Sequence, residues 1–303
     1  MSVSIYKIKK WIKMITGKSI LHVNQGVGKF FQSGKVLGYY NDLTEKVTKD
    51  PETLEKRVLP IAYNEEGKQV VFATTIFQYG LGSYDLFLET NEEKYIDQFK
   101  NCVNWACANQ DQNGGWDISC CGGLESKYGA MAQGEGASLL LRANKYHNDE
   151  KYFLAAKKAI DLMLTPIEKG GTSRYENDEI FLMEFMDKPC ILNGWIFSLF
   201  GLYDLTLGCD EEKYKSALLL TLNTLKSHLS DFDCGYWSKY DVDKMIASPF
   251  YHKLHIAQLK ALLMIDNDAA FSEMLAKFEK YQNSWWNRKR AFIKKACQKV
   301  FEK

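Results

Sequence analysis

Eight long apolar segments with helical periodicity most constrain the fold of this chain. They are 14 to 18 residues long, and only five Pro in 303 residues interrupt the chain. Most of the linkers between them are short, so consecutive helices are expected to pack antiparallel as helical hairpins. The expected helices are 74–89, 94–110, 130–147, 151–164, 190–207, 213–229, 252–266 and 270–286.

Three longer connections repeat a glycine-aromatic pattern. "QNGGWDIS" near 116, "KGGTSRYEN" near 175 and "DCGYWSKYD" near 237 follow successive helix pairs at intervals of about 60 residues. A loop that recurs once per helix pair is typical of an all-α toroid, an (α/α) barrel of antiparallel helical hairpins with these loops at one end. The alternative is that Gly and aromatic residues coincide in these loops by chance.

Composition and charge narrow the organisation and the partners. No Pro/Ser-rich linker divides the chain, so we expect an N-terminal basic helix and arm (1–70), a helical barrel (71–285) and a basic amphipathic tail (286–303). The overall charge is +1, but the two ends are strongly basic, so the middle is net acidic. An acidic body argues against a nucleic-acid partner.

The cysteines and the N-terminus suggest the compartment. Eight Cys with no Cys-x-x-Cys pair are expected to be reduced and to bind no zinc. The first residues interleave Lys with single apolar residues and do not form the apolar core of a signal peptide. We therefore expect a cytoplasmic protein.

Polar and aromatic residues occur near the starts of several expected helices, where a buried face would favour apolar residues. In a toroid such residues point into the central cavity, where they can bind sugar hydroxyls or stack on sugar rings. Each could instead be a satisfied buried group or a surface residue. They are Gln78, Tyr79, Tyr84, Gln133, Glu135, Asn193, His255 and Gln258.

Five phenol or imidazole groups fall within the stretch 233–259: Tyr236, Tyr240, Tyr251, His252 and His255. Such groups can donate or accept protons, so this stretch is a candidate for catalysis.

Five blocks resemble, in the same order, the C-terminal helical domain of D-glucuronyl C5-epimerases. They are "QYGLGSY" (78–84), "NQDQNGGW" (109–116), "AMAQGEGASLLLRA" (130–143), "CILNGWIFSLFGLYDL" (190–205) and "YHKLHIAQL" (251–259), with a weaker match in "GYYNDLTEKV" (38–47). The resemblance implies a helical barrel that acts on uronate-containing polysaccharides without a cofactor, in a bacterial-type polysaccharide pathway. The β-rich insertion of the animal enzymes between the first two blocks is absent here.

By this resemblance, the functional positions fall on Tyr84, Glu184, Tyr240 and Tyr251. C5 epimerisation removes the proton next to a carboxylate and returns one to the opposite face, so it needs two proton-handling groups and a way to neutralise the carboxylate. Tyr251 is the expected base or acid at C5. Glu184 is expected to stay protonated by desolvation and to hydrogen-bond the carboxylate, and Tyr240 to orient it. The alternative for Glu184 is an ordinary carboxylate paired with a lysine.

Two positions depart from the family pattern. Phe185 stands where the family has a tyrosine, and Asp243 stands where it has an arginine. Lys244 could supply the cation instead, and His255 or Tyr84 could supply the missing acid. The expected substrate contacts are Tyr84, Tyr79, Gln133, Asn193, Lys244, His255 and Trp116.

Other chemistries stay open. A polysaccharide lyase would share the C5 carbanion, a glycoside hydrolase would need two carboxylates among Glu125, Glu135, Asp231 and Asp233, and a glycan-binding protein would need no catalysis. His252 and His255 form an HxxH pair, but no acidic or Cys partner is evident nearby, so we expect no metal.

Both basic ends alternate Lys or Arg with Trp, Ile or Phe at helical spacing, as in "IYKIKKWIKMI" and "WWNRKRAFIKKACQKVF". Such helices can lie on an anionic membrane surface, which would place the protein at the inner face of a membrane. Alternatively, they pack on the barrel with the lysines in solvent. A homodimer is also open.

Overall fold

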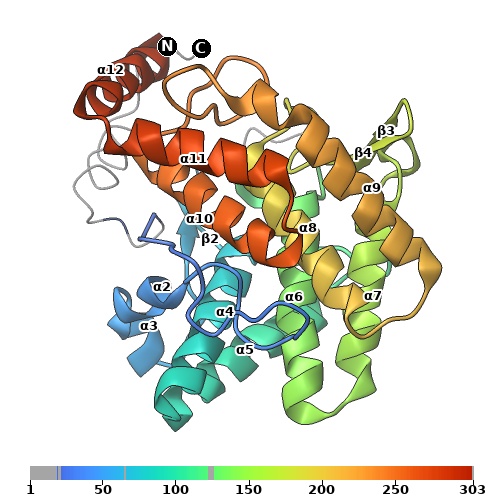
Figure 1. The fold of residues 1–303 in the computed structure, drawn as a ribbon. Coiled ribbons are helices and arrows are strands. Elements are labelled where there is room, and N and C mark those ends of the chain that lie inside the picture. The colour runs from blue at the N-terminus through green and yellow to red at the C-terminus, as the bar shows by residue number, and fades with distance from the viewer. Residues whose placement is uncertain (1–18, 20–21, 65, 122–125, 302–303) are drawn as a thin grey trace.

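The computed structural model describes residues 19, 22–64, 66–121 and 126–301. Each of the eight expected helical segments corresponds to a helix, and the fold is the expected (α/α) toroid (Figure 1). The four hairpins are α4–α5, α6–α7, α8–α9 and α10–α11. Their bounds are α4 Ala73–Thr90, α5 Glu93–Asn109, α6 Ala130–His147, α7 Glu150–Leu164, α8 Leu192–Thr206, α9 Glu212–His228, α10 Pro249–Ile265 and α11 Ala269–Asn283.

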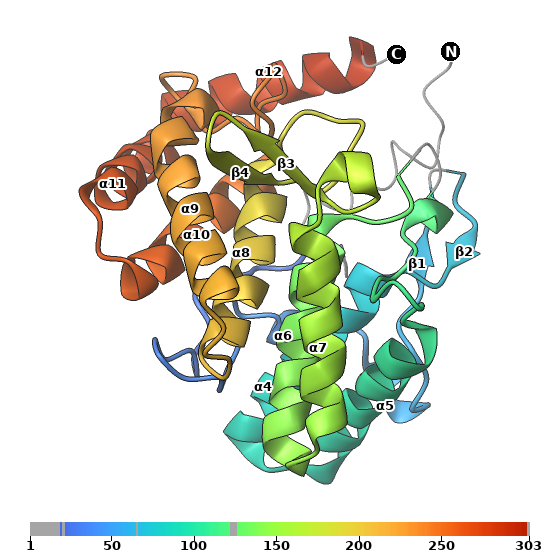
Figure 2. The ribbon, with the colours of Figure 1, turned by 90° about the vertical axis from the view of Figure 1, so that its right-hand side faces the viewer.

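Two helix boundaries differ from the expectation. α10 begins at Pro249, because Ser248 caps it by accepting a hydrogen bond from the Tyr251 amide and Pro fits the first helical position. The expected segment 270–286 is two helices: α11 ends before Ser284, and α12 (Trp285–Phe301) continues in a new direction (Figure 2). No helix among the described residues is both long enough and apolar enough to cross a bilayer.

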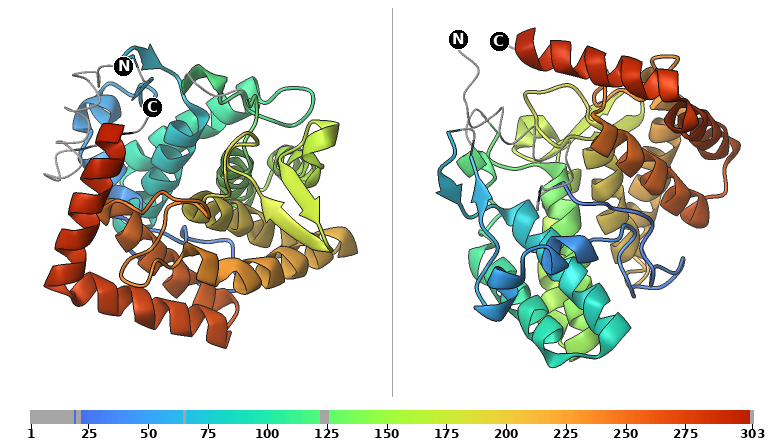
Figure 3. Two further views of the ribbon diagram at one scale, coloured as in Figure 1. Left: turned by 90° about the horizontal axis from the view of Figure 1, so that it is seen from above. Right: turned by 90° about the vertical axis from the view of Figure 1, so that its left-hand side faces the viewer.

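The inner helices contact one another in the order α4, α6, α8, α10, and the hairpins follow one another around a ring in the view from above (Figure 3). α6 and α8 approach most closely. A Cβ at Gly201 would lie 2.2 Å from the carbonyl oxygen of Gly134, so two glycines permit backbone contact between these helices.

Two small hairpins lie at the end of the barrel that carries the long connections (Figure 2). Strands β1 (Ala62–Tyr63) and β2 (Gln69–Val70) pair antiparallel ahead of α4. Strands β3 (Ser173–Glu176) and β4 (Glu179–Leu182) pair between α7 and α8, with Asn177 and Asp178 at positive φ in the turn, as a tight hairpin requires.

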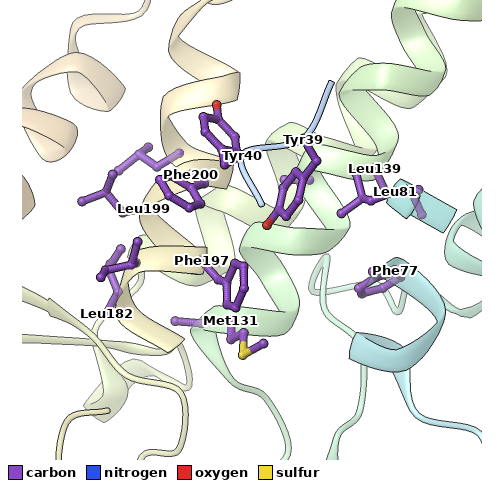
Figure 4. Close-up of a cluster of buried hydrophobic side chains, with 14 of the residues drawn as sticks. Tyr39, Tyr40, Phe77, Leu81, Met131, Leu139, Leu182, Phe197, Leu199 and Phe200 are labelled. Atoms are coloured by element: carbon purple, nitrogen blue, oxygen red, sulfur yellow. The ribbon is translucent and has the colours of Figure 1, made fainter. Parts of the chain in front are cut away.

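The segment before the barrel packs into the core. Tyr39 and Tyr40 are buried, and Tyr40 stacks on Phe200 of α8 at a centroid distance of 4.1 Å (Figure 4). Two short helices follow, α2 (Thr44–Thr48) and α3 (Pro51–Glu55), and α2 contacts α4. The basic N-terminal helix expected before this segment lies outside the described residues.

A buried ion pair joins this segment to two inner helices. Arg142 of α6 donates to Asp204 of α8 at 2.7 Å and to the Gly38 carbonyl at 2.9 Å. The second oxygen of Asp204 accepts from the Tyr40 hydroxyl at 2.7 Å. Because both charged side chains are buried, each depends on the other for stabilisation.

Replacement of Asp204 by Asn should therefore destabilise the fold by about 3–5 kcal/mol, because it leaves the Arg142 cation without its counter-ion. Urea unfolding followed by circular dichroism measures this loss. Asp210→Asn, at a fully exposed position after α8, should change stability by no more than about 0.5 kcal/mol. Equal stabilities of the two variants would contradict the importance of the pair.

Candidate active site

A cavity of about 210 Å³ opens at the end of the barrel that carries the long connections. Its walls come from the segment before the barrel, the start of α4, the α5–α6 and α7–α8 connections, and the starts of α6, α8 and α10. Two of the three connections that contain the glycine-aromatic pattern, α5–α6 and α7–α8, thus contribute residues to the cavity wall.

Glu184 lies in this wall, two residues after the end of β4. Burial of its carboxyl group raises its pKa to about 8. A Cβ at Gly194 of α8 would lie 2.1 Å from Glu184 Oε2, so the missing side chain at Gly194 leaves room for this carboxyl. Oε2 has no hydrogen-bond partner among the described residues.

Tyr251 lies in the cavity wall at the start of α10, and Tyr240 packs against it with ring centroids 4.8 Å apart. A hydrogen bond connects the two hydroxyls. Burial, and next the charge of Glu184, raise the pKa values of both tyrosines above the ordinary phenol value. The structure thus brings together Glu184, Tyr240 and Tyr251, and at neutral pH both tyrosines are protonated.

A buried cation lies in the same cavity wall. Lys46 of α2 is 9% exposed, and burial lowers its pKa to about 8, although the charge of Glu135 opposes this shift. Glu135 of α6 accepts a hydrogen bond of 2.7 Å from Gln78, which also lines the cavity, and burial raises the Glu135 pKa to about 8. Lys46 and Gln78 therefore present a cation and an amide to anything bound here.

Several polar atoms in and beside the cavity have no partner among the described residues. Besides Glu184 Oε2, they include Asn193 Oδ1 in the wall and Glu135 Oε2 behind Gln78. Unpaired buried polar atoms are costly, so these atoms would be stabilised by hydrogen bonds to water or to a polar ligand in the cavity. Gln133 is also buried with both amide atoms unpaired, but it does not line the cavity.

Three other predicted substrate contacts lie in the core, away from the cavity. Tyr84 packs on Phe99 between α4 and α5, and Tyr79 donates to the Asp50 carbonyl at 3.3 Å. Trp116 donates to the Ala106 carbonyl at 2.8 Å. The burial of large aromatic rings accounts for all three, and none lines the cavity.

Lys244 and His255 do not line the cavity either. Lys244 is exposed in a turn that Asp241 organises, and Asp243 is exposed beside it. His255 is buried, with Nδ1 3.0 Å from Ser238 Oγ, and the same hydroxyl lies 2.7 Å from His252 Nδ1. Neither alternative acid, His255 or Tyr84, is at the cavity, whereas Phe185 does line it.

The remaining candidate carboxylates are dispersed. Asp231 lies 2.9 Å from His228, Asp233 accepts from Tyr281, and Glu125 lies outside the described residues. No cluster of three or more His, Cys, Asp or Glu suited to a metal ion occurs within the described ranges.

The model of the family "D-glucuronyl C5-epimerase C-terminus" matches residues 110–280, more than half of the chain. The chain belongs to this family. The matched region includes Glu184 and Tyr251, which line the cavity, and Tyr240, which packs on Tyr251. Lys46 and Gln78 precede it.

Two relatives match part of the chain. D-glucuronyl C5-epimerase of Caenorhabditis elegans is 31% identical over 210 residues, which is 60% of this chain and 34% of the relative. An uncharacterized protein of Methanocaldococcus jannaschii is 29% identical over 140 residues, 43% of this chain and 44% of that protein. The matches thus span less than half the length of each relative.

Solved structures with the same fold have little sequence in common with this family member. A UGL variant with dGlcA-Glc-Rha-Glc superposes with a TM-score of 0.51 at 11% identity, over 91% of this chain and 82% of that one. An α-1,6-mannanase of Salegentibacter sp. HEL1_6 gives a TM-score of 0.50 at 14% identity, over 78% and 70% of the two chains. These likenesses support the toroid fold.

The raised pKa of Glu184 makes stability depend on pH. The unfolded carboxyl ionises near pH 4.5 and the folded one near pH 8, so stability should fall as pH rises across this interval, by up to about 1.4 kcal/mol per pH unit for this group. Glu184→Gln should flatten the fall, and Glu135 should account for part of what remains. Urea unfolding at pH 5, 6, 7 and 8 measures the slope.

Glu93→Gln, at an exposed position in the first turn of α5, is the matched control and should leave the slope unchanged. A Glu184→Gln slope equal to that of the wild type would show that Glu184 ionises normally in the folded protein.

Proposed function

We propose that this chain is a uronate C5-epimerase that acts on a uronate-containing polysaccharide, with D-glucuronate as the residue it epimerises. One observation carries the proposal: in a member of the D-glucuronyl C5-epimerase family, the Glu184 carboxyl and the Tyr251 phenol line one cavity together with a buried cation, and a second phenol, Tyr240, packs on Tyr251. The curated nematode relative bears this activity in its name.

Epimerisation at C5 requires a base on one face of the sugar ring and an acid on the other. Glu184, with a pKa of about 8, is poised near neutral pH to take the C5 proton as a carboxylate. Tyr251, whose phenol is held protonated, donates its proton to the opposite face of C5. The forward step leaves Glu184 protonated and Tyr251 as a phenolate, and the starting state returns when Glu184 gives its proton to solvent and Tyr251 takes one from solvent. The reverse reaction starts from the other state, with Tyr251 as the base and Glu184 as the acid.

Tyr240 acts on Tyr251. Once Tyr251 has given up its proton, the hydrogen bond from the Tyr240 hydroxyl stabilises the phenolate. Since Tyr240 does not line the cavity, it is a positioning residue in this mechanism.

Lys46 supplies the charge that the C5 carbanion needs. Negative charge moves into the uronate carboxylate as the proton leaves, and a buried cation beside that carboxylate stabilises it far more than a solvated one would. The sequence offered Lys244 for this role, but Lys46 is the lysine in the cavity wall.

Both proton-transfer groups can be tested in one experiment. In D2O, the wild type should introduce deuterium at C5 of a glucuronate-containing oligosaccharide, and Glu184→Gln and Tyr251→Phe should each slow this about 10²- to 10⁴-fold, as expected for loss of a general acid or base. Mass spectrometry of the recovered sugar measures the exchange.

Tyr175→Phe, at an exposed position in β3, is the control and should exchange normally. Near-normal exchange by Glu184→Gln would show that Glu184 only hydrogen-bonds the carboxylate. Ultraviolet absorbance from a new C4–C5 double bond would identify a lyase instead. Binding without exchange by the wild type would identify a glycan-binding protein.

Replacement of Lys46 by Met should remove the carboxylate contact. We expect weaker substrate binding and slower C5 exchange, together about 10-fold or more in kcat/KM, because a partner of the developing charge is lost. The protein should remain folded, since Met occupies a similar volume without a buried charge. Lys49→Met, one turn away and exposed, should leave kcat/KM unchanged, and equal effects of the two would exclude a specific role for Lys46.

A further inference from the structure

Helix α12 packs on the rest of the protein with a largely polar face. The residues that face inward are Asn287, Ala291, Lys295 and Gln298, which recur every three or four positions. Gln298 accepts from the Ile246 amide at 3.1 Å and donates to the Lys244 carbonyl at 2.7 Å. Lys295 is 6% exposed, with Nζ 5.7 Å from the centre of the Tyr240 ring.

The apolar face of α12 points outward. Trp286 is 75% exposed and Ile293 61% exposed, and Trp285 and Phe292 lie on the same side, each more than a third exposed. A helix that only covers the barrel would turn these side chains inward, because burying them is favourable. An exposed row of large apolar side chains therefore indicates a surface that something else covers.

The charge of α12 restricts what that partner can be. The helix has no Asp or Glu, and its cations are Arg288, Lys289, Arg290, Lys294, Lys295 and Lys299. A second copy of the same helix would bring like charges together. The segment 1–19 is also basic, with Lys and no acid, so its charge does not complement this face either.

Beside this face lies a groove of about 550 Å³ between α12 and the start of α10. Trp285, Phe292 and Ile293 give it apolar walls, while Arg288, Lys289 and Lys253 supply cations. Lys289 Nζ lies 3.9 Å from the centre of the Trp285 ring. Aromatic rings beside cations suit the boundary between phospholipid headgroups and acyl chains.

We propose that α12 docks the protein onto an anionic phospholipid surface, with Trp285, Trp286, Phe292 and Ile293 inserted at the headgroup boundary and the adjacent Lys and Arg contacting lipid phosphates. Because α12 lies at the end of the barrel that carries the long connections, docking brings the cavity end to the membrane (Figures 1 and 2). This inference holds whether or not the chain is an epimerase.

Sedimentation with vesicles tests it. The full chain should bind vesicles of equal parts phosphatidylcholine and phosphatidylglycerol, bind phosphatidylcholine alone at least about tenfold more weakly, and dissociate as salt rises. Trp286→Ser combined with Ile293→Ser should abolish binding. The control, Leu154→Ser combined with Leu219→Ser, changes two exposed apolar residues on α7 and α9 and should bind as the wild type does.

A second variant tests how much the cations of α12 contribute to vesicle binding. Arg288→Gln, Lys289→Gln and Lys294→Gln together should weaken binding to the anionic vesicles and reduce its dependence on salt. Equal binding to both vesicle types, or no binding to either, would overturn the proposal. So would a dimer in sedimentation equilibrium that the Trp286→Ser, Ile293→Ser variant abolishes, since a second copy would then cover α12.

Discussion

The contact between α6 and α8 positions most of what surrounds the cavity. Gly134 and Gly201 let the two backbones touch, and Arg142 and Asp204 join the same helices by a buried ion pair farther along. Asp204 accepts from three donors, including Tyr40 of the preceding segment. This contact therefore aligns the starts of α6 and α8, where Glu135 and Asn193 lie, and draws in the segment that carries Lys46.

The sequence predicts the helices well because each needs only local information. Apolar residues at helical spacing and capping residues such as Ser248 determine where a helix forms, and eight such segments define a toroid. The resemblance to a family identified Glu184, Tyr240 and Tyr251 as functional positions, and the structure places them together. Local patterns alone would not have selected Glu184, which lies in a loop without periodicity.

The sequence does not show a residue's environment where long-range packing decides it. Lys46 belongs to a five-residue helix, and only the packing of α2 on α4 shows that it is buried. Trp116 was expected to contact the substrate because it follows two glycines in a loop, yet its indole is buried and donates to a backbone carbonyl. Tyr79 and Tyr84 share α4 with Gln78, but only Gln78 faces the cavity, because successive residues on a helix point about 100° apart.

Buried polar groups that have hydrogen-bond partners differ in meaning from buried polar groups without partners and from exposed apolar side chains. Asp204 is buried, but three donors satisfy it, and its role is structural. Glu184 and Asn193 keep unpaired oxygens at a cavity, and α12 exposes large apolar side chains beside cations; both arrangements reduce the stability of the isolated chain. A protein can keep such a loss of stability where binding of a ligand or a surface compensates for it. We therefore expect this protein to bind its partners at the cavity and at the exposed face of α12.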